Sequence, residues 1–187
     1  MALIKTRARG LKLDDTFAFT GTVSGAGGGI TVARSWRQNA DTTIAGSGNQ
    51  FLTANWEPLD QTVEGEIGTN LSESSGIFTF PETGIYYVTY NLYCNLENDD
   101  YHFRNIIHAT SNNSSYSLFA RGSSAIQRSS GSYQFTAIAQ SLFDVTDTTQ
   151  CKLKFGYNSA LAPSGSKVYG ETSYNGTAVI FIRLGDT

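Results

Sequence analysis

The sequence predicts an all-β fold, a sandwich of two antiparallel sheets. Three observations lead to this prediction. The 187 residues are 40% hydrophobic and include 10 tyrosines and 11 phenylalanines against one methionine and three prolines, a composition that favours strands. Short apolar segments alternate with turn sequences, and no segment shows helical periodicity. One strand, within residues 85–93, carries large side chains on both of its faces.

Two regions are expected along the chain: an N-terminal arm at residues 1–29, and a head domain at residues 30–187. The arm closes in a glycine-rich hinge, Ser24–Gly29. So short a segment cannot bury its own apolar side chains, so they must pack against another surface. Attachment to that surface is assigned to Lys5, Arg7, Arg9, Leu11, Leu13, Phe17 and Phe19.

Nine strands are predicted in the head domain. They are expected at Thr31–Trp36, Gln50–Leu52, Gly76–Phe80, Ile85–Leu92, His102–His108, Tyr116–Ala120, Tyr133–Phe143, Cys151–Tyr157 and Ala178–Leu184. Links rich in Gly, Ser and Asn separate several of them and are expected to be surface loops. The number and spacing of the strands suit a two-sheet sandwich, and their order matches a jelly roll.

The strand that follows the Pro81–Gly84 turn needs a cover on its second face. Side chains alternate along it, with Tyr86, Val88, Tyr90 and Leu92 on one face and Ile85, Tyr87 and Tyr93 on the other. An antiparallel strand usually keeps one face in water, so bulky side chains on both faces predict that something covers the second. Another copy of the chain is the expected cover; the alternative is that segment 35–60 of the same chain packs over Tyr87.

The sequence contains no motif that indicates catalytic chemistry. No nucleophile elbow is present, and the glycine run at 25–29 completes neither a dinucleotide-binding nor a Walker motif. His102 and His108, the only histidines, would lie about 20 Å apart on one strand, too far to share a metal. We therefore expect no enzyme, no catalytic residue and no cofactor. The two cysteines, Cys94 and Cys151, are expected to be unpaired buried thiols.

Neither nucleic acid nor a membrane is expected as a partner. The arm is basic, but no aromatic groove or further basic stripe accompanies it, so nucleic acid is not predicted as a partner. No apolar run reaches the length of a transmembrane helix, and residues 1–13 lack the apolar core of a secretory signal, so the chain is expected to be made in the cytoplasm. Glu97, Asp99 and Asp100 are weak candidates for calcium ligands; a solvated turn is the alternative.

Two sequence blocks carry a family resemblance. Phe80, the turn, and Gly84-Ile-Tyr86 with its alternating continuation form the first, and Ser173-Tyr174-Asn175-Gly176-Thr177 leading into Ala178–Leu184 forms the second. Together they resemble the globular head of complement-type and tumour-necrosis-factor-type (TNF-type) proteins over roughly residues 35–185. The family's Gly-Asp turn is only approximated, by Thr146-Asp147.

This resemblance implies a TNF-like jelly roll that assembles into a homotrimer around a threefold axis. Tyr87 and Tyr174 stand at the positions of the family's axial aromatics. Ile85 and Phe181 are expected to join them in the trimer interface. Some members of the family bind calcium, which is the reason to consider residues 97–100 as ligands.

Residues 1–25 resemble an N-terminal segment shared by structural proteins of marine tailed bacteriophages. This resemblance implies a virion protein that binds capsid or tail proteins through the arm and is made in the bacterial host. The expected function is a trimeric head-decoration protein or short fibre displayed on the particle surface, with an adhesive role. One alternative is a tail-fibre tip that binds a host surface glycan or receptor. Two alternatives of other classes are a secreted complement-like recognition head and a polysaccharide-degrading tailspike.

Overall fold

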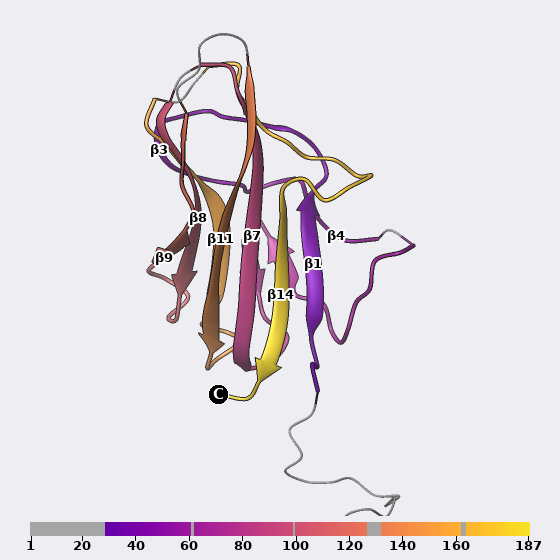
Figure 1. Cartoon of the computed structure of the whole chain (residues 1–187). Helices are drawn as coiled ribbons and strands as arrows, with labels where there is room; N and C mark the ends of the chain where they lie inside the picture. The colour runs from indigo at the N-terminus through magenta and orange to yellow at the C-terminus, as the bar shows by residue number, and fades with distance from the viewer. Residues whose placement is uncertain (1–28, 61, 99, 127–131, 162–163) are drawn as a thin grey trace, which may run out of the picture.

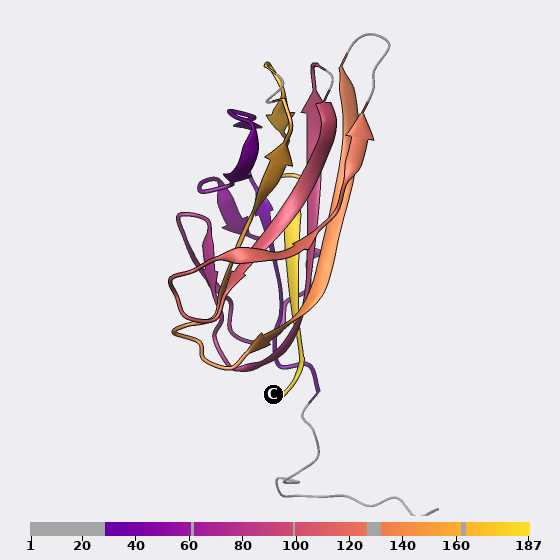
Figure 2. The same cartoon turned by 90° about the vertical axis from the view of Figure 1, so that its left-hand side faces the viewer.

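Two seven-stranded antiparallel sheets pack face to face in the computed structural model, which describes residues 29–187 apart from residues 61, 99, 127–131 and 162–163 (Figures 1 and 2). Sheet A contains β1 (Ala33–Gln38), β2 (Thr42–Thr43), β4 (Trp56–Pro58), β7 (Gly84–Leu96), β11 (Tyr133–Val145), β13 (Lys167–Val168) and β14 (Ala178–Gly185). Sheet B contains β3 (Gly48–Phe51), β5 (Ser72–Ser74), β6 (Ile77–Thr79), β8 (Asp100–Thr110), β9 (Ser117–Arg121), β10 (Ser124–Ile126) and β12 (Lys152–Ser159).

All nine predicted strands are present, so the predicted two-sheet, all-β architecture is confirmed. The strands that the prediction missed in the described residues are β2, β4, β5, β10 and β13, each of two or three residues. The predicted arm, with Lys5, Arg7, Arg9, Leu11, Leu13, Phe17 and Phe19, lies outside the described residues.

The centre of sheet A is strand β7, which pairs with β11 along all 13 residues of both strands. On its other side β7 pairs with β14, which in turn pairs with β1, and β1 pairs with β4. The order across the sheet is therefore β11, β7, β14, β1, β4, as Figure 1 shows from left to right.

The predicted faces of β7 are confirmed. Tyr86, Val88, Tyr90 and Leu92 are fully buried between the sheets, while the alternate side chains point away from sheet B. The Tyr86 hydroxyl donates a hydrogen bond to the carbonyl oxygen of Glu82 (3.0 Å), and burial raises the pKa of Tyr86 to about 12.

Aromatic rings fill much of the space between the sheets. The ring of Phe78 on sheet B lies 5.2–5.5 Å, centroid to centroid, from the rings of Trp36, Trp56, Phe155 and Phe181. Such pairs add about 0.5–1.5 kcal/mol each beyond the burial of their area. The two cysteines are unpaired and buried at the edges of this core, as predicted.

Asn105 of β8 ties the two sheets together through hydrogen bonds in the core. Its side-chain amide donates to the carbonyl oxygens of Tyr90 (2.9 Å) and Ala137 (3.1 Å), which belong to sheet A. Its side-chain oxygen accepts a hydrogen bond from the backbone N–H of Gly122 (2.7 Å). A fully buried amide with three partners of this kind fixes the distance between the sheets at one point.

Replacing Asn105 by alanine is expected to lower the free energy of unfolding by about 2–4 kcal/mol. The change removes three hydrogen bonds and leaves two buried carbonyls and one buried N–H without their partner. Chemical denaturation followed by tryptophan fluorescence measures the loss. Asn158→Ala, at a half-buried position on the outside of sheet B, is the control and should cost no more than about 1 kcal/mol. Equal losses in the two variants would contradict the bridging role of Asn105.

Gly84 lies at the turn into β7, as predicted, in a conformation with φ of 139°. A Cβ atom at this position would clash with the carbonyl oxygen of Gly185, so only glycine allows the start of β7 to lie against the end of β14. Beside it, the guanidinium of Arg183 donates to the carbonyl oxygen of Thr83 (2.7 Å) and to Oγ1 of Thr31 (3.3 Å), and it pairs with Asp186. The start of the described chain and its C-terminus therefore meet at one end of the sandwich (Figure 1).

The turn between β11 and β12 fixes the register of the following strands. Asp147 accepts hydrogen bonds from the backbone N–H and the hydroxyl of Thr149 (both 2.7 Å), and its carbonyl accepts one from Cys151 (2.8 Å). Thr146-Asp147 thus takes the place of the Gly-Asp turn that the resemblance implied. From this turn β12 runs antiparallel to β8 in the middle of sheet B.

Candidate functional site

The face of sheet A that points away from sheet B, called the outer face below, carries large apolar side chains in its central strands. They are Ile85, Tyr87 and Tyr93 of β7, Ile138 and Leu142 of β11, and Ile180, Ile182 and Leu184 of β14. Within the described residues Leu142, Ile138 and Leu184 are more than half exposed. Soluble monomers rarely expose this many large apolar side chains on one sheet face unless a partner binds it.

The apolar side chains of the outer face are neighbours across three strands. Leu142 of β11 lies opposite Tyr87 of β7, which lies opposite Ile182 of β14. In the next row Ile180 lies opposite the polar Thr89, and in the row after it Ile138 of β11 lies opposite Asn91. The apolar side chains are therefore contiguous across all three strands in the row of Tyr87, and polar residues lie between this row and Ile138.

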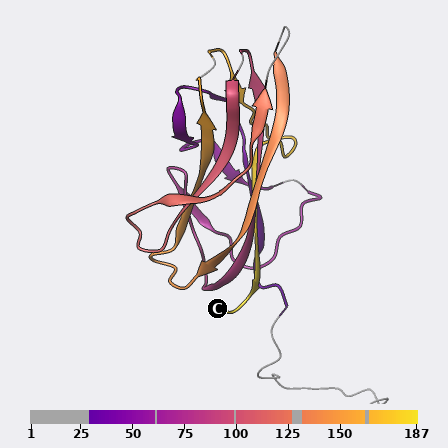
Figure 3. The ribbon, with the colours of Figure 1, turned by 60° about the vertical axis from the view of Figure 1, so that its left-hand side comes forward.

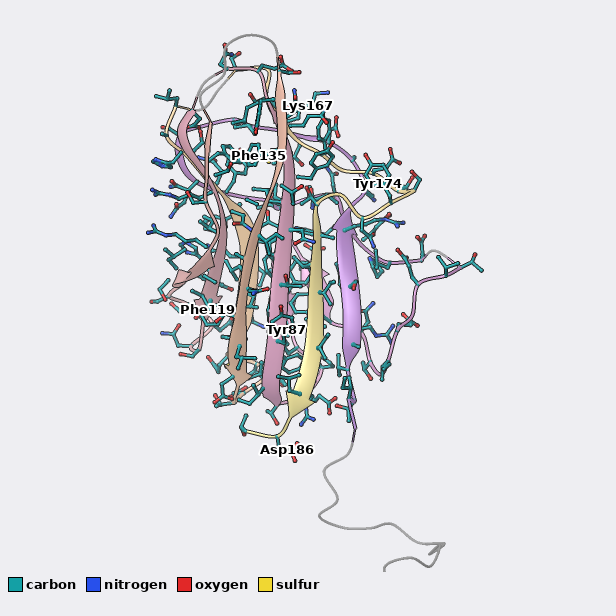
Figure 4. All side chains as sticks on the ribbon, in the orientation of Figure 1. Tyr87, Phe119, Phe135, Lys167, Tyr174 and Asp186 are labelled. Atoms are coloured by element: carbon teal, nitrogen blue, oxygen red, sulfur yellow. The ribbon has the colours of Figure 1, made fainter. Side chains whose placement is uncertain are left out.

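Tyr87 lies in the middle of this surface, as Figure 4 shows, and its hydroxyl donates to the side-chain oxygen of Gln140 (2.8 Å). The alternative cover, segment 35–60 of the same chain, does not lie over Tyr87. Its strands β1 and β4 are part of sheet A itself, beyond β14. Ile85 is half-buried on the same face, two residues before Tyr87. The structure thus places two of the predicted interface residues on the exposed face.

Tyr174 lies in the loop before β14, at the end of the outer face distant from Gly84 (Figure 4). Its ring and that of Tyr93 flank Gly176, and 53% of Tyr174 is exposed. A side chain at Gly176 would push against both rings. The glycine in the second sequence block therefore allows two tyrosines to gather at this end of the face.

The prediction that Phe181 belongs to the interface is wrong. Its partner in the ladder is Val88, a core residue, so Phe181 points between the sheets and is fully buried. Its neighbours Ile180 and Ile182 occupy the outer face instead. The register of β14 decides this, and the sequence alone leaves that register open.

Sequence reasoning also missed the contribution of β11. Inward positions of this strand hold the small residues Ala137 and Ala139, while Ile138 and Leu142 point outward. Around Ile138 a large residue points outward between two small inward ones, which reverses the usual pattern of a half-exposed strand. The same argument that was applied to β7 could have been applied here. Leu142 and Phe143 are adjacent and therefore point to opposite faces, so large side chains on both faces of β11 also predict a cover.

One margin of the outer face holds a buried arginine among carboxylates. Arg37 of β1 is 1% exposed, and its guanidinium lies 2.8 Å from Glu57, 2.6 Å from Asp60 and 3.8 Å from Glu64. Burial alone would lower the pKa of Arg37, but hydrogen bonds to Glu57 and Asp60 outweigh burial and raise it above its ordinary value. Next to this cluster a cavity of about 250 Å³ is lined by Arg34, Asp60, Glu64 and Glu66, among others.

The calcium candidates do not form a metal site in the described residues. Asp100 is buried, and its two oxygens accept hydrogen bonds from the Ser159 hydroxyl (2.6 Å) and the Ala160 N–H (3.0 Å). Glu97 accepts a hydrogen bond from Asn95, and Asp99 lies outside the described residues. Nowhere in the described part do three or more His, Cys, Asp or Glu side chains gather in a way that could hold a metal ion.

The histidines lie apart on the outside of sheet B. His102 is hydrogen-bonded to Asn158 (2.9 Å), whereas the ring of His108 packs edge-on against Phe51. Burial, with the neighbouring Lys154, lowers the pKa of His108. Separately, the part of the chain that the structure describes contains no helix with the length and hydrophobicity to cross a bilayer.

Comparison with solved structures identifies the fold class as a TNF-like jelly roll. The chain is similar to murine APRIL at pH 8.5, with 14% identity, a TM-score of 0.56 and coverage of 82% of this chain and 98% of that one. It is similar to murine APRIL at pH 5.0, with 11% identity, a TM-score of 0.58 and the same coverage. Eiger TNF from S. frugiperda matches with 12% identity, a TM-score of 0.56 and coverage of 85% and 95%.

At these identities the likeness establishes the fold alone, and it confirms the predicted TNF-like jelly roll. No protein-family model matches the chain, and no curated protein matches its sequence.

Proposed function

We propose that the chain is a homotrimeric structural protein of a bacteriophage virion, displayed on the particle surface as a head-decoration protein or short fibre with an adhesive role. The observation that carries the assembly is the exposed apolar outer face of sheet A. The resemblance of residues 1–25 to the segment of phage structural proteins supports the place in a virion. The proposal gives the protein a structural and binding role and no catalytic one.

A second copy of the chain is the cover that best fits this face. Among the described strands β11 pairs with β7 alone, so its other long edge has no strand partner in sheet A, although Gly122 lies against this edge at Ile138. A long edge strand beside an exposed apolar face favours association and is a liability in a monomer. Closed symmetry with three copies removes both the exposed face and the edge from water. The mass in solution is then about three times 20.2 kDa, which light scattering measures; a stable monomer contradicts the assembly.

The arm is proposed to mount the trimer on other virion proteins, either capsid or tail. It precedes β1, which begins at the end of the sandwich where Arg183 binds Thr31 and Asp186. All three arms of a trimer whose axis runs along the strands would leave from that one end. The opposite end, where β7 turns into β8, would face away from the particle and towards a host glycan or receptor (Figure 3).

Deleting residues 1–24 is expected to leave a soluble trimer of nearly unchanged melting temperature that no longer joins particles. The reason is that the arm lies before the glycine hinge, whereas the described core is built from residues after Gly29. Calorimetry gives the melting temperature, and labelled electron microscopy of intact particles locates the protein on head or tail. Fusion of residues 1–24 to an unrelated trimeric head is the control for sufficiency. Normal decoration by the truncated protein would place the attachment surface on the head domain.

A further inference from the structure

A ring of three identical copies requires two different surfaces that fit each other. In a twofold dimer the same patch meets itself, but in a threefold ring one side of each copy meets the opposite side of the next. The surfaces available for this contact are the margin of the outer face at β1 and β4 and the opposite side of the sandwich, where β11 of sheet A lies beside β9 of sheet B, and they differ in charge. This inference rests on the proposed trimer and concerns how neighbouring copies are held in register.

The margin formed by β1, β4 and the loop after β4 is acidic, and we call it the acidic margin. It contains Glu57, Asp60, Glu64 and Glu66 with only two guanidinium groups, those of Arg34 and Arg37, so two negative charges remain in excess. Arg37 is buried, whereas the side chains of Asp60 and Glu66 are 71% and 63% exposed. The exposed carboxylates beside the 250 Å³ cavity favour a positively charged partner.

The opposite side of the sandwich, where β11 of sheet A and β9 of sheet B lie, presents a positive side chain that belongs to sheet B. Arg121, the last residue of β9, is exposed and has no ion-pair partner within the described part of the chain. Arg121 pairs with Ile106 of the neighbouring strand β8. Arg104, two residues before Ile106 on β8, adds a second positive charge. The next residue, Gly122, lies against the edge of β11, where a Cβ atom would clash with the carbonyl oxygen of Ile138.

The acidic margin and Gly122, the residue that follows Arg121, lie at the same height of sheet A. Ile138 of β11 pairs with Asn91, Asn91 with Ala178, Ala178 with Arg37, and Arg37 with Glu57. This one row of the ladder leads from the edge beside Gly122 directly to the centre of the acidic margin. Rotation about an axis parallel to the strands leaves the height of every residue unchanged. Arg121 of one copy, one residue from Gly122, therefore comes near the level of the acidic margin of the next.

We propose that Arg121 of each copy binds the acidic margin of its neighbour, with Asp60 and Glu66 as its exposed partners. The apolar outer face supplies the hydrophobic contact, and this ion pair sets the direction and height at which the copies join. A guanidinium forms paired hydrogen bonds with carboxylates, so Arg121 suits this role better than a lysine would.

The test is a charge swap measured by analytical ultracentrifugation. Arg121→Glu and Asp60→Arg should each raise the protein concentration at which half of the trimer is dissociated by about tenfold or more, because three ion pairs are lost and three repulsions appear per ring. The double variant with both changes should recover most of the loss, since each contact again joins opposite charges. A double variant no better than the single ones overturns the proposal.

Mixing the two single variants gives a second readout that depends on the ring having three members. A mixed ring has an odd number of contacts, so at least one contact always joins like charges. Mixing should therefore recover less than the double variant does. Recovery that equals the double variant would contradict the three-membered ring of unlike contacts.

Lys152→Glu is the matched control because it makes the same change of charge on the outside of sheet B, where the lysine binds Thr79 (3.0 Å). It should leave the trimer unchanged. Circular dichroism checks that Asp60→Arg still folds; if it does not, Glu66→Arg replaces it as the acidic-margin variant. An unmodified protein that is monomeric would end the proposed assembly. A trimer that Arg121→Glu leaves intact at every concentration would overturn only the inference about Arg121.

Discussion

Replacement of Tyr87 by aspartate is expected to convert the proposed trimer into folded monomers. Tyr87 lies on the outer face between Leu142 and Ile182, so the change adds a charge to the centre of the proposed interface. Burying a large apolar side chain contributes roughly 1.5–3 kcal/mol, and the change acts three times in each ring. The cost of burying an unpaired carboxylate adds to this loss. The isolated domain should stay folded because Tyr87 belongs to none of its core contacts.

Sedimentation velocity at several protein concentrations measures this effect, and circular dichroism reports whether the monomer is folded. Tyr87→Phe is the matched control: it keeps the ring and loses only the hydrogen bond to Gln140, so the trimer should persist. Tyr174→Asp should also weaken the assembly, since Tyr174 is exposed at the end of the same face. Persistence of the trimer with aspartate at position 87 would place the contact surface elsewhere.

Replacement of the preceding residue should have the opposite kind of effect. Tyr86→Ala is expected to lower the free energy of unfolding by about 3–5 kcal/mol, as large-to-small changes of buried aromatics do. Tyr86 is fully buried and its ring lies 4.7 Å from that of Phe80, centroid to centroid. A loss of this size is a large part of the stability of an ordinary domain.

Thermal unfolding measures the loss for Tyr86. Tyr86→Phe keeps the ring in the core and loses only the hydrogen bond to Glu82, so it should cost about 1 kcal/mol. A melting temperature of Tyr86→Ala within a few degrees of the unmodified protein would contradict the packing of Tyr86 in the core. Tyr86→Ala tests folding and Tyr87→Asp tests assembly, so the two variants together separate these effects at adjacent positions of one strand.

The sequence predicts the long strands well because the alternation along each of them is a local property. In β7 the identity of both faces can be assigned from residues 85–93 alone, and the burial of Tyr86 and Tyr90 agrees with it. The strands β2 and β13 could not be found in this way, because two residues carry no period. They form where β13 pairs with the end of β7 on one side and with β2 on the other.

The candidate site depends more on pairing between distant segments, and less of it could be predicted. Tyr87 and Ile85 follow from the faces of one strand, but Phe181 was assigned to the wrong face because its side depends on the register of β14 against β7. The acidic margin escaped the sequence analysis for a similar reason. Glu64 and Glu66 look like ordinary surface charges until folding brings Arg37, from a strand more than twenty residues earlier, beside Glu64.

The position of the two chain ends has a consequence for engineering. Thr31 and Asp186 bind the same guanidinium, that of Arg183, so the start of the head domain and the C-terminus lie side by side. In the proposed arrangement, a peptide fused after Thr187 would sit between the head and the surface that carries it, where it would be shielded and would interfere with mounting. Cargo intended for display on such particles should instead be inserted at the far end, in the connection that follows Leu96.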